Sequence, residues 1–463
     1  RSAEPVRTGG AMKDQEAVRF KYYKTILEEA PTIRDAVLTA IEEDPDMPVD
    51  SKLYLMVFAP ALVGFADWVL RKAEMEKKDR IYFLSRDGYQ IYLTAKALAA
   101  KRRFAISCKY FHISRYAARI PTYYRNVEES FDTICTGGID VTPFKILKKG
   151  ALTDAECMEI LDELNLCGEK DKILNYSEVL QLKDRLKTSR KIRTYIESHS
   201  KEAYEGAAAF FRQEGLTDDG NYLIVDSGWI GTLQQSIEIL VQSMNPDIRV
   251  QGCYFGMYDT PKGMGEDQFF TYFFSKRSGL KRKIHFSNSL FETIVSSEEG
   301  MTIGYEKKED HYKPVFCENA NPNGLQMEQN LMALQLFLKH LKTDQETLIG
   351  LPVIEKLFYR FMSEPSLLEV KAYGDNRFSD DVMEGTLKKV AAELSEEQIR
   401  NQRFFRKLLI IAGIRKATIY ESAWLEGSTA RLYEKQPGLA RKEYRHIRLY
   451  KAFVFGKKQF SRK

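Results

Sequence analysis

Hydrophobic residues recur along the chain with two different periods, and the changes between them predict an α/β fold. Helical spacing runs through residues 14–43 and 50–77, whereas 80–84 is a short continuous apolar run typical of a buried strand. Helical spacing returns at 91–99, after a polar loop. This order of strand, loop and helix is the first half of a βαβ unit, which builds a parallel sheet.

Four more apolar runs are predicted as strands, and they place the sheet in two separate parts of the chain. They cover residues 108–113, 221–225, 250–257 and 268–274. The stretch between the first two is rich in Lys, Glu and Leu and predicts inserted helices, and the chain after residue 326 is almost wholly helical in its pattern. The predicted organisation is a remnant of recombinant expression at 1–12, an N-terminal helical segment at 13–50, an α/β core at 51–125 and 191–310, a helical insertion at 126–190, and a helical C-terminal region with a basic tail at 311–463.

Composition excludes several classes of protein. The chain has 463 residues, of which 44% are hydrophobic and 29% charged, so it is neither disordered nor fibrous in character. Six cysteines are scattered without a CxxC pair, which argues against a zinc site or a disulfide framework and favours a reducing compartment. The longest uncharged apolar run, 53–66, has fourteen residues and is too short to span a bilayer, so we expect a buried helix there. With no apolar leader in the first dozen residues, the predicted location is the cytoplasm, with the inner face of the cytoplasmic membrane as an alternative.

The net charge of +5 is a property of the C-terminal tail. Residues 431–463 contain eleven Lys and Arg but two Glu, so the rest of the chain is slightly acidic. The tail is either a solvated helix face or, because aromatic and apolar residues alternate with its cations, a surface for an anionic membrane or an acidic glycan. No nucleic-acid recognition motif accompanies it, so we predict no nucleic-acid partner. The residues concerned are Tyr444, Ile447, Tyr450, Phe453 and Phe455.

Two polar loops follow predicted strands and open helices, where open α/β sheets bind phosphorylated ligands. In the loop 226–232, an acid at the strand end could accept hydrogen bonds from sugar hydroxyls, while glycine and threonine at the helix start suit a phosphate. In the loop 85–88, Arg86 and Gly88 suit a second phosphate group. Each loop taken alone is also compatible with a purely structural turn. Taken together, the two loops predict a ligand with two phosphate groups flanking a ribose.

These residues resemble a known family. LIVDSGWIGTL at 223–233 resembles the phosphoribosyl diphosphate (PRPP) motif of type I phosphoribosyltransferases, FLSRDG at 83–88 is similar to their diphosphate loop, and ISR at 113–115 is similar to a further basic contact. More narrowly, the three motifs resemble a phosphoribosyltransferase-like module of bacterial surface-polysaccharide biosynthesis (O-antigen or capsule), a module often fused to a HAD-type phosphatase. The resemblance covers 52–125 and 220–305, about a third of the chain.

The resemblance implies an open parallel sheet of the type I phosphoribosyltransferase kind and a ribofuranosyltransferase activity. It implies that a 5-phospho-ribofuranosyl group passes from PRPP to a sugar hydroxyl of a bacterial surface glycan, with inversion to a β-linkage and release of diphosphate. Magnesium would accompany the diphosphate, with Asp226 as a possible ligand. Asp87 and Glu292 are the catalytic candidates, and His285 is a candidate for base or acceptor contact. The predicted donor-binding residues are Ser85, Arg86, Gly88, Arg115, Asp226, Ser227, Gly228, Trp229, Ile230, Gly231 and Thr232.

Departures from the family pattern leave alternatives open. Ser227 stands where the motif has its second acid, and the loop is about two residues shorter than in nucleotide-forming enzymes. The sequence FDT at 131–133 does not follow an apolar strand, so we expect the phosphatase to be a separate domain or protein. The insertion and the C-terminal region are expected to form the cleft for the glycan. The alternatives are a PRPP- or nucleotide-binding regulatory or scaffold protein, and a nucleobase phosphoribosyltransferase.

Overall fold

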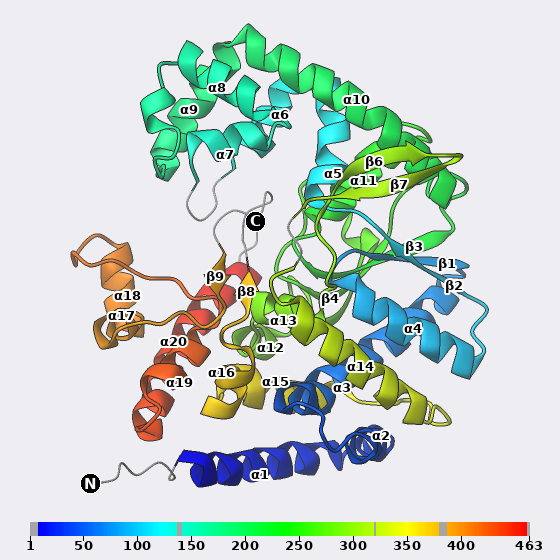
Figure 1. Cartoon of the computed structure of the whole chain (residues 1–463), viewed down its shortest axis with the longest axis vertical. Helices are drawn as coiled ribbons and strands as arrows, with labels where there is room; N and C mark the ends of the chain where they lie inside the picture. Colours follow the sequence, from blue (N-terminus) through cyan, green and yellow to red (C-terminus); the bar gives the residue numbers. More distant parts are fainter. Residues whose placement is uncertain (1–7, 137–140, 319–320, 379–386, 461–463) are drawn as a thin grey trace, which may run out of the picture.

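A five-stranded parallel sheet in the order β2-β1-β3-β4-β5 forms the centre of the protein (Figure 1). The computed structural model describes residues 8–136, 141–318, 321–378 and 387–460. All neighbouring strands pair in parallel, and most side chains of β1, β3 and β4 are buried, as continuous apolar runs require. The predicted α/β class with an open parallel sheet is therefore confirmed. The strands are β1 (Arg80–Leu84), β2 (Ser107–Phe111), β3 (Tyr222–Trp229), β4 (Gly252–Met257) and β5 (Phe269–Phe274).

The end of β3 differs from the prediction. We expected a loop from residue 226, but the strand continues to Trp229, and Gly228 pairs with Gly256 of β4. A Cβ atom on Gly228 would lie 2.0 Å from the carbonyl oxygen of Gly256, and its φ of 128° also requires glycine. The glycine that suggests a turn in the sequence thus marks a close approach of two strands.

Helices cover both faces of the sheet: the helix that follows β1 lies on one face, and the helix that follows β3 lies on the other. Ile81 and Phe83 of β1 face one hydrophobic core together with α4 (Gly88–Arg102) and α3 (Val49–Met75). Tyr82 and Leu84 face a second core with α11 (Thr232–Gln242) and the second half of α10 (Arg190–Glu214). Because the crossovers after β1 and β3 lie on opposite faces, the strand order has its switch point between these strands. A crevice for a ligand forms there at the carboxyl ends.

The apolar run at 53–66 lies in α3, which crosses the middle of the first core. Among the described residues, α3 is the one helix long and apolar enough to cross a bilayer, and 94% of its most apolar window is buried inside the protein. The packing of α3 against α4 and α14 accounts for this composition. Further helices that contribute to this core include α1 (Thr8–Leu27), which begins within the stretch that we expected to be an expression remnant, α2 (Pro31–Glu43), α14 (Gly324–His340) and α15 (Leu351–Phe358).

The predicted insertion forms a small helical unit with its own core. Its helices pack on Ile192 and Ile196, in the first half of α10, whereas Phe210 and Phe211 of the second half pack on the sheet. The long helix α10 therefore joins the unit to the sheet (Figure 1). Residues 137–140 of the predicted stretch lie outside the described residues. The unit contains α6 (Val127–Ile134), α7 (Pro143–Lys148), α8 (Asp154–Glu163) and α9 (Tyr176–Thr188), after α5 (Arg115–Arg119) and the 3-10 segment Ile120–Arg125.

The C-terminal region is mainly helical, with two short antiparallel pairs that the sequence pattern did not indicate. The strands β6 (Thr302–Lys308) and β7 (His311–Phe316) form a hairpin across the predicted boundary at 310, and β8 (Arg377–Phe378) pairs with β9 (Lys388–Lys389). Both pairs are too short or too polar to show a core-facing alternation. The remaining helices are α12 (Leu280–Ile284), α13 (Asn288–Val295), α16 (Leu367–Tyr373), α17 (Glu396–Asn401), α18 (Phe404–Ile411), α19 (Leu425–Leu432) and α20 (Pro437–Phe460), with a π-helical turn at Tyr359–Ser363.

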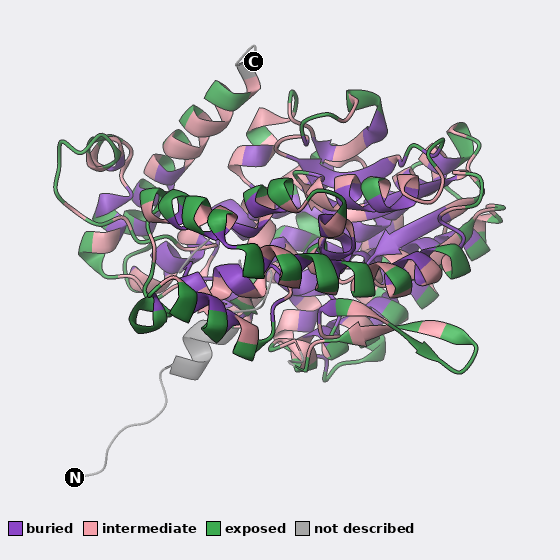
Figure 2. Cartoon of the chain, turned by 90° about the horizontal axis from the view of Figure 1, so that it is seen from above, coloured by how far each residue is buried: buried purple, intermediate pink, exposed green. Residues whose placement is uncertain are grey.

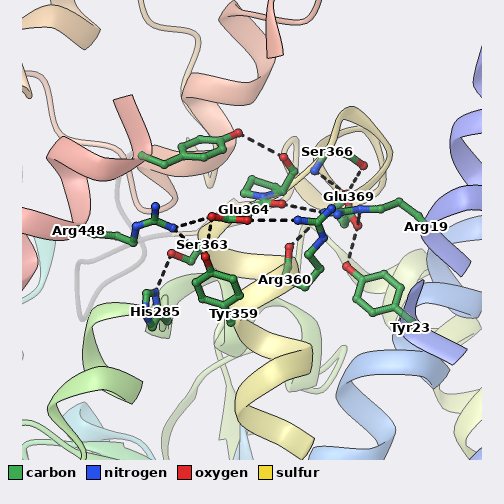
Figure 3. A network of polar contacts seen from close by, with 12 residues as sticks. Arg19, Tyr23, His285, Tyr359, Arg360, Ser363, Glu364, Ser366, Glu369 and Arg448 are labelled. Carbon is green, nitrogen blue, oxygen red and sulfur yellow. Dashed lines mark hydrogen bonds and ion pairs between the residues drawn. The ribbon is translucent and has the colours of Figure 1, made fainter. Parts of the chain in front are cut away.

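A buried polar network connects the first helix with the last (Figure 3). Arg19 of α1 donates to Glu369 of α16 at 2.6 Å, and the Tyr23 hydroxyl donates to the same carboxylate at 2.7 Å. Beside this pair, Glu364 accepts from the Tyr359 hydroxyl at 2.6 Å and from Arg448 of α20 at 2.9 Å. We call these groups the terminal network, because they hold α1 and α20 to the same part of the core.

Most of the tail's apolar side chains serve internal packing. Tyr444 and Ile447 are buried in the main core, Tyr450 lies under the Lys407 ammonium, and Phe455 stacks on Tyr258 with ring centroids 5.2 Å apart. Of the five tail residues that we considered for a membrane surface, Phe453 alone is exposed. The sequence could not distinguish these uses because the partner residues are remote in the chain.

Candidate functional site

A cavity of about 310 Å³ opens at the switch point of the sheet. Its walls are the loops after β1 and β2, the end of β3 with the start of α11, and residues of α13, β6 and β8. The volume lies at the lower end of the range for small-molecule sites. Of the two predicted contributors to a glycan cleft, the C-terminal region supplies lining residues, while the described part of 126–190 supplies none.

The structure brings most of the predicted site residues to this cavity. The lining includes Ser85, Arg86, Asp87, Arg115, the whole of 226–232, and Glu292, although Glu292 is about sixty residues beyond that loop in sequence. Gly88 and His285 lie elsewhere. A Cβ atom on Gly88 would lie 3.1 Å from the backbone of Phe83, so this glycine allows the first turn of α4 to approach β1.

His285 belongs to the terminal network (Figure 3). Its Nδ1 lies 2.9 Å from the Ser363 hydroxyl, and its ring packs edge-on against Tyr359. Burial, together with the nearby cations Arg448 and Lys451, lowers the pKa of His285 to about 4, so the imidazole is neutral at physiological pH. The candidate role for His285 as base or acceptor contact therefore has no support from its position.

Three carboxyl groups lie together at the cavity, and all have raised pKa values. Burial and the neighbouring charge of Asp87 raise the pKa of Asp226 to about 7. Burial and the charge of Asp87 also raise the pKa of Glu292. Burial raises the pKa of Asp87 itself, although a hydrogen bond from Ser227 and the charges of Arg86 and Arg115 act in the opposite direction. The site thus has three partly buried acids with raised pKa values, which is typical of functional sites.

Ser227 positions a second acid beside Asp226. The Ser227 hydroxyl donates to Asp87 at 2.8 Å, and the Ser227 amide donates to Asp226 at 2.8 Å. The family pattern has a second acid at position 227, and here the carboxylate of Asp87 from the other loop lies next to that position. The departure at Ser227 therefore does not leave the site with a single acid.

Trp229 has a packing role and positions Glu292. Its indole N–H donates to the Glu292 carboxylate, and its ring lies among Phe274, Phe286 and Tyr258. The adjacent Ile230 is exposed at the cavity. The aromatic surroundings leave Trp229 as part of the wall rather than a free face on which a sugar could stack.

The Ser85 hydroxyl is used within the protein. It donates to the carbonyl of Ile113 and accepts from the amide of Ile113, both at 2.8 Å. This pair of bonds joins the ends of β1 and β2, so it holds the loops that bear Arg86 and Arg115 in a fixed relation. The peptide bond between Ser85 and Arg86 is cis. The Ser85 side chain therefore has a structural role, and its predicted ligand contact stays a prediction.

Cationic and helix-terminal groups line the same cavity as the acids. Arg86 and the exposed Arg115 enter from the loops after β1 and β2. The helix α11 begins at Thr232 with Gly231 as its N-cap in a left-handed conformation, and no described side chain caps it. The first-turn amides and the helix dipole favour an anion at this end.

Arg377 of β8 adds a third guanidinium that sequence reasoning did not find. It lines the cavity, and its backbone is held by reciprocal 2.8 Å hydrogen bonds with Asn323, whose side chain accepts from the Arg377 amide and donates to its carbonyl. The strand is two residues long and lies about 150 residues beyond the PRPP-like motif. A single basic residue in a short irregular segment gives no sequence signal.

The acids could support magnesium only together with a ligand. Among the described residues, no group of three or more His, Cys, Asp or Glu side chains has the arrangement of a metal site. Magnesium commonly binds through one or two carboxylates and the phosphates of a substrate, and Asp226 and Asp87 satisfy that limited requirement. The donor set therefore fits an ion that arrives with a diphosphate.

No family model matches the chain, and no curated protein matches it. The chemistry of the site is accordingly derived from its own geometry.

Proposed function

We propose that the protein is a PRPP-dependent glycosyltransferase that moves a 5-phospho-ribofuranosyl group to a sugar hydroxyl of a bacterial surface glycan. The observation that supports this most is the content of one cavity: three arginines and a helix start without a side-chain cap beside three partly buried carboxyl groups, at the switch point of a parallel sheet. A sugar with phosphates at both ends needs cationic contacts at two places and acceptors for its hydroxyls between them.

We infer one orientation for the donor from the positions of these groups. Arg86 and Arg115, with the backbone of 85–87, would hold the diphosphate, and the segment Gly228 to Thr232 at the start of α11 would hold the 5-phosphate. Asp226 lies in β3 just before the segment that would hold the 5-phosphate. Its carboxylate would accept hydrogen bonds from the ribose hydroxyls. Magnesium, when bound with the diphosphate, supplies charge neutralisation for the leaving group.

The residues of the chain then perform three tasks. The guanidinium groups stabilise the negative charge that develops on the departing diphosphate, and the pocket holds the acceptor hydroxyl on the opposite face of the ribose ring, which inverts the α-configured donor to a β-linkage. A carboxylate accepts the proton of the acceptor hydroxyl. Asp87 and Glu292 are the candidates, because a pKa raised toward neutrality makes a carboxylate a stronger base than in water.

The product would retain its 5-phosphate, so we also propose that a separate phosphatase acts after this protein. We propose the cytoplasm as the location.

Incubation with PRPP labelled in the ribose, magnesium and a panel of oligosaccharide acceptors tests the proposal. We expect acceptor-dependent release of diphosphate and a labelled glycan, at least a hundred-fold slower in Glu292→Gln or Asp87→Asn if that residue is the base. The variant Lys307→Ala, in an exposed hairpin position outside the cavity, should retain the parent rate. Transfer to free nucleobases would instead favour a nucleobase phosphoribosyltransferase, and PRPP binding without turnover on any acceptor would favour a regulatory protein.

A further inference from the structure

The helix α18 has the reverse of the usual distribution of polar and apolar residues. Lys407 is buried, with its ammonium over the ring of Tyr450 and donating to Gln402 at 2.7 Å, and burial lowers its pKa. On the outer side, Phe405 is 75% exposed and Leu409, one turn later, is 42% exposed. Burial of a lysine is unfavourable and exposure of a phenylalanine forgoes hydrophobic stabilisation, so this orientation disfavours the isolated protein on both counts.

The segment after α18 extends the apolar surface and adds cations. Ile411 and Ile414 are exposed, and Ile414 is followed directly by the exposed Arg415 and Lys416. Residues 403–420 contain three Arg and two Lys but no Asp or Glu. Three of these cations are paired with acids outside the segment: Arg403 with Glu443, Arg406 with Glu397 and Lys407 with Glu421. The positive charge beside the exposed apolar side chains therefore comes from Arg415 and Lys416, for which the described residues provide no ion pair.

One face of α20 repeats this combination. At intervals of four residues, Arg445, Leu449, Phe453 and Lys457 are all exposed, so an apolar pair is flanked by two cations on one side of the helix. The ring of Phe453 packs edge-on against Phe404 of α18 at 5.9 Å, which places the two helices side by side. In Figure 1, α18 lies at the edge of the molecule opposite to β1 and β2, and in Figure 2 the end of α20 projects from the body.

We propose that this surface docks the protein on an anionic lipid bilayer. The apolar side chains would enter the boundary between headgroups and acyl chains, and the cations would contact the negative headgroups, as in interfacial amphipathic helices. The proposal does not depend on the proposed enzymatic function. We call the surface the α18–α20 surface, which consists of Phe405, Leu409, Ile411, Ile414, Arg415, Lys416, Arg445, Leu449, Phe453 and Lys457.

The charge distinguishes a bilayer from a second copy of the chain. A two-fold dimer through the α18–α20 surface would place the same cations against each other, because a symmetric interface uses one patch twice. Like charges brought together across an interface oppose association. An anionic bilayer has the opposite charge and also an apolar interior for Phe405 and Ile414.

Flotation with lipid vesicles tests the proposal. We expect the full chain to float with phosphatidylcholine vesicles that contain about 30 mol% phosphatidylglycerol, to float at least about ten-fold less with pure phosphatidylcholine, and to lose binding as salt is raised. The double variant Phe405→Ser/Ile414→Ser should bind about ten-fold more weakly, as should Arg415→Glu/Lys416→Glu. These side chains are exposed, so an unchanged melting temperature is expected to show that the variants fold.

Two matched controls make the result specific. Leu325→Ser removes an apolar side chain that is 73% exposed on another helix, and Lys262→Glu/Lys307→Glu makes the same change in net charge at exposed positions elsewhere. Both controls should float like the parent. The proposal is overturned if the parent does not float with the anionic vesicles, if the α18–α20 variants bind as well as the controls, or if sedimentation shows a dimer that the Phe405 variant disrupts without any vesicle binding.

Discussion

Two clusters of acids, in the terminal network and at the switch-point cavity, differ in burial and in their partners, and the difference separates a structural role from a functional one. In the terminal network, Glu369 is fully buried and is paired with Arg19 at 2.6 Å. At the switch-point cavity, Asp226 of β3 and Glu292 of α13 have no guanidinium at ion-pair distance among the described residues, and the cations of the cavity lower their pKa values less than burial raises them. The buried acid that is paired with a guanidinium holds helices together, whereas the partly buried acids of the cavity, which lack a guanidinium partner among the described residues, can still accept contacts from a ligand.

One carboxyl group from each cluster, Glu364 and Asp226, has a shifted pKa, and the two shifts have opposite signs. Burial of Glu364 in the terminal network acts to raise its pKa, but hydrogen bonds from Tyr359 and Arg448 and the charge of Arg448 outweigh it, so the pKa is lowered. For Asp226, burial and the charge of Asp87 act in the same direction and the pKa rises to about 7. Near neutral pH, the Glu364 carboxylate therefore stabilises the folded state, whereas ionisation of Asp226 destabilises it.

The largest expected effect comes from breaking the pair in the terminal network. Glu369→Gln leaves the buried Arg19 guanidinium without a counter-charge, so the free energy of unfolding should fall by about 3 kcal/mol or more. Urea denaturation at neutral pH measures this. Glu29→Gln, at the half-exposed pair with Lys356, is the control and should change stability by about 0.5 kcal/mol at most. Equal losses in the two variants would contradict the structural role of Glu369.

At the cavity, removal of an acid is expected to increase the free energy of unfolding instead of lowering it. The folded-state pKa of Asp226 is raised, so the ligand-free protein loses stability as pH rises from about 4 to about 7. Asp226→Asn removes this penalty, and we expect it to stabilise the ligand-free protein by about 2 kcal/mol at pH 8 and to have little effect near pH 4. Denaturation curves at both pH values check the prediction, and a loss of stability at pH 8 would show that contacts within the protein stabilise the ionised Asp226 more than burial disfavours it.

Substitution of Glu364 is expected to lower the free energy of unfolding, by a smaller amount and at neutral pH only. The pKa of Glu364 is lower in the folded than in the unfolded state, so the ionised carboxylate stabilises the folded state. This stabilisation is complete above the pKa of the unfolded state and is lost as the pH falls through the pKa of the folded state. Glu364→Gln should therefore cost about 1 kcal/mol at pH 7 and nothing near pH 3. A variant that is destabilised equally at both pH values would indicate lost packing instead of lost charge.

The sequence predicts the parts of the fold that depend on local pattern. The strand at 80–84 was predicted with its observed ends, because a continuous apolar run between polar residues fixes both limits. The end of β3 was not predicted, because a glycine in the sequence is compatible both with a turn and with a close contact between strands, as at Gly228. Arg377 and the outward face of α18 were not predicted either, since both depend on tertiary contacts with Asn323 and Tyr450 that no local period reports.

The same distinction applies within the candidate site. The two loops at 85–88 and 226–232 were expected to meet, because the carboxyl ends of parallel strands share one edge of a sheet. The bond between Ser227 and Asp87, and the use of the Ser85 hydroxyl by Ile113, follow from side-chain positions that the motif does not specify. The sequence thus indicates where a ligand could bind, and the structure shows which groups remain for it.

Calorimetric titration of the full chain with PRPP and magnesium is the most direct test of the central claim, that the basic and acidic groups of the cavity bind a doubly phosphorylated ribose. We predict saturable binding by the parent, weakened at least about ten-fold by Arg86→Ala, Arg377→Ala or Asp226→Asn and unchanged by Lys307→Ala. Absence of binding by the parent at saturating PRPP and magnesium, or equal binding by all the variants, would contradict the claim and leave the two loops as structural turns.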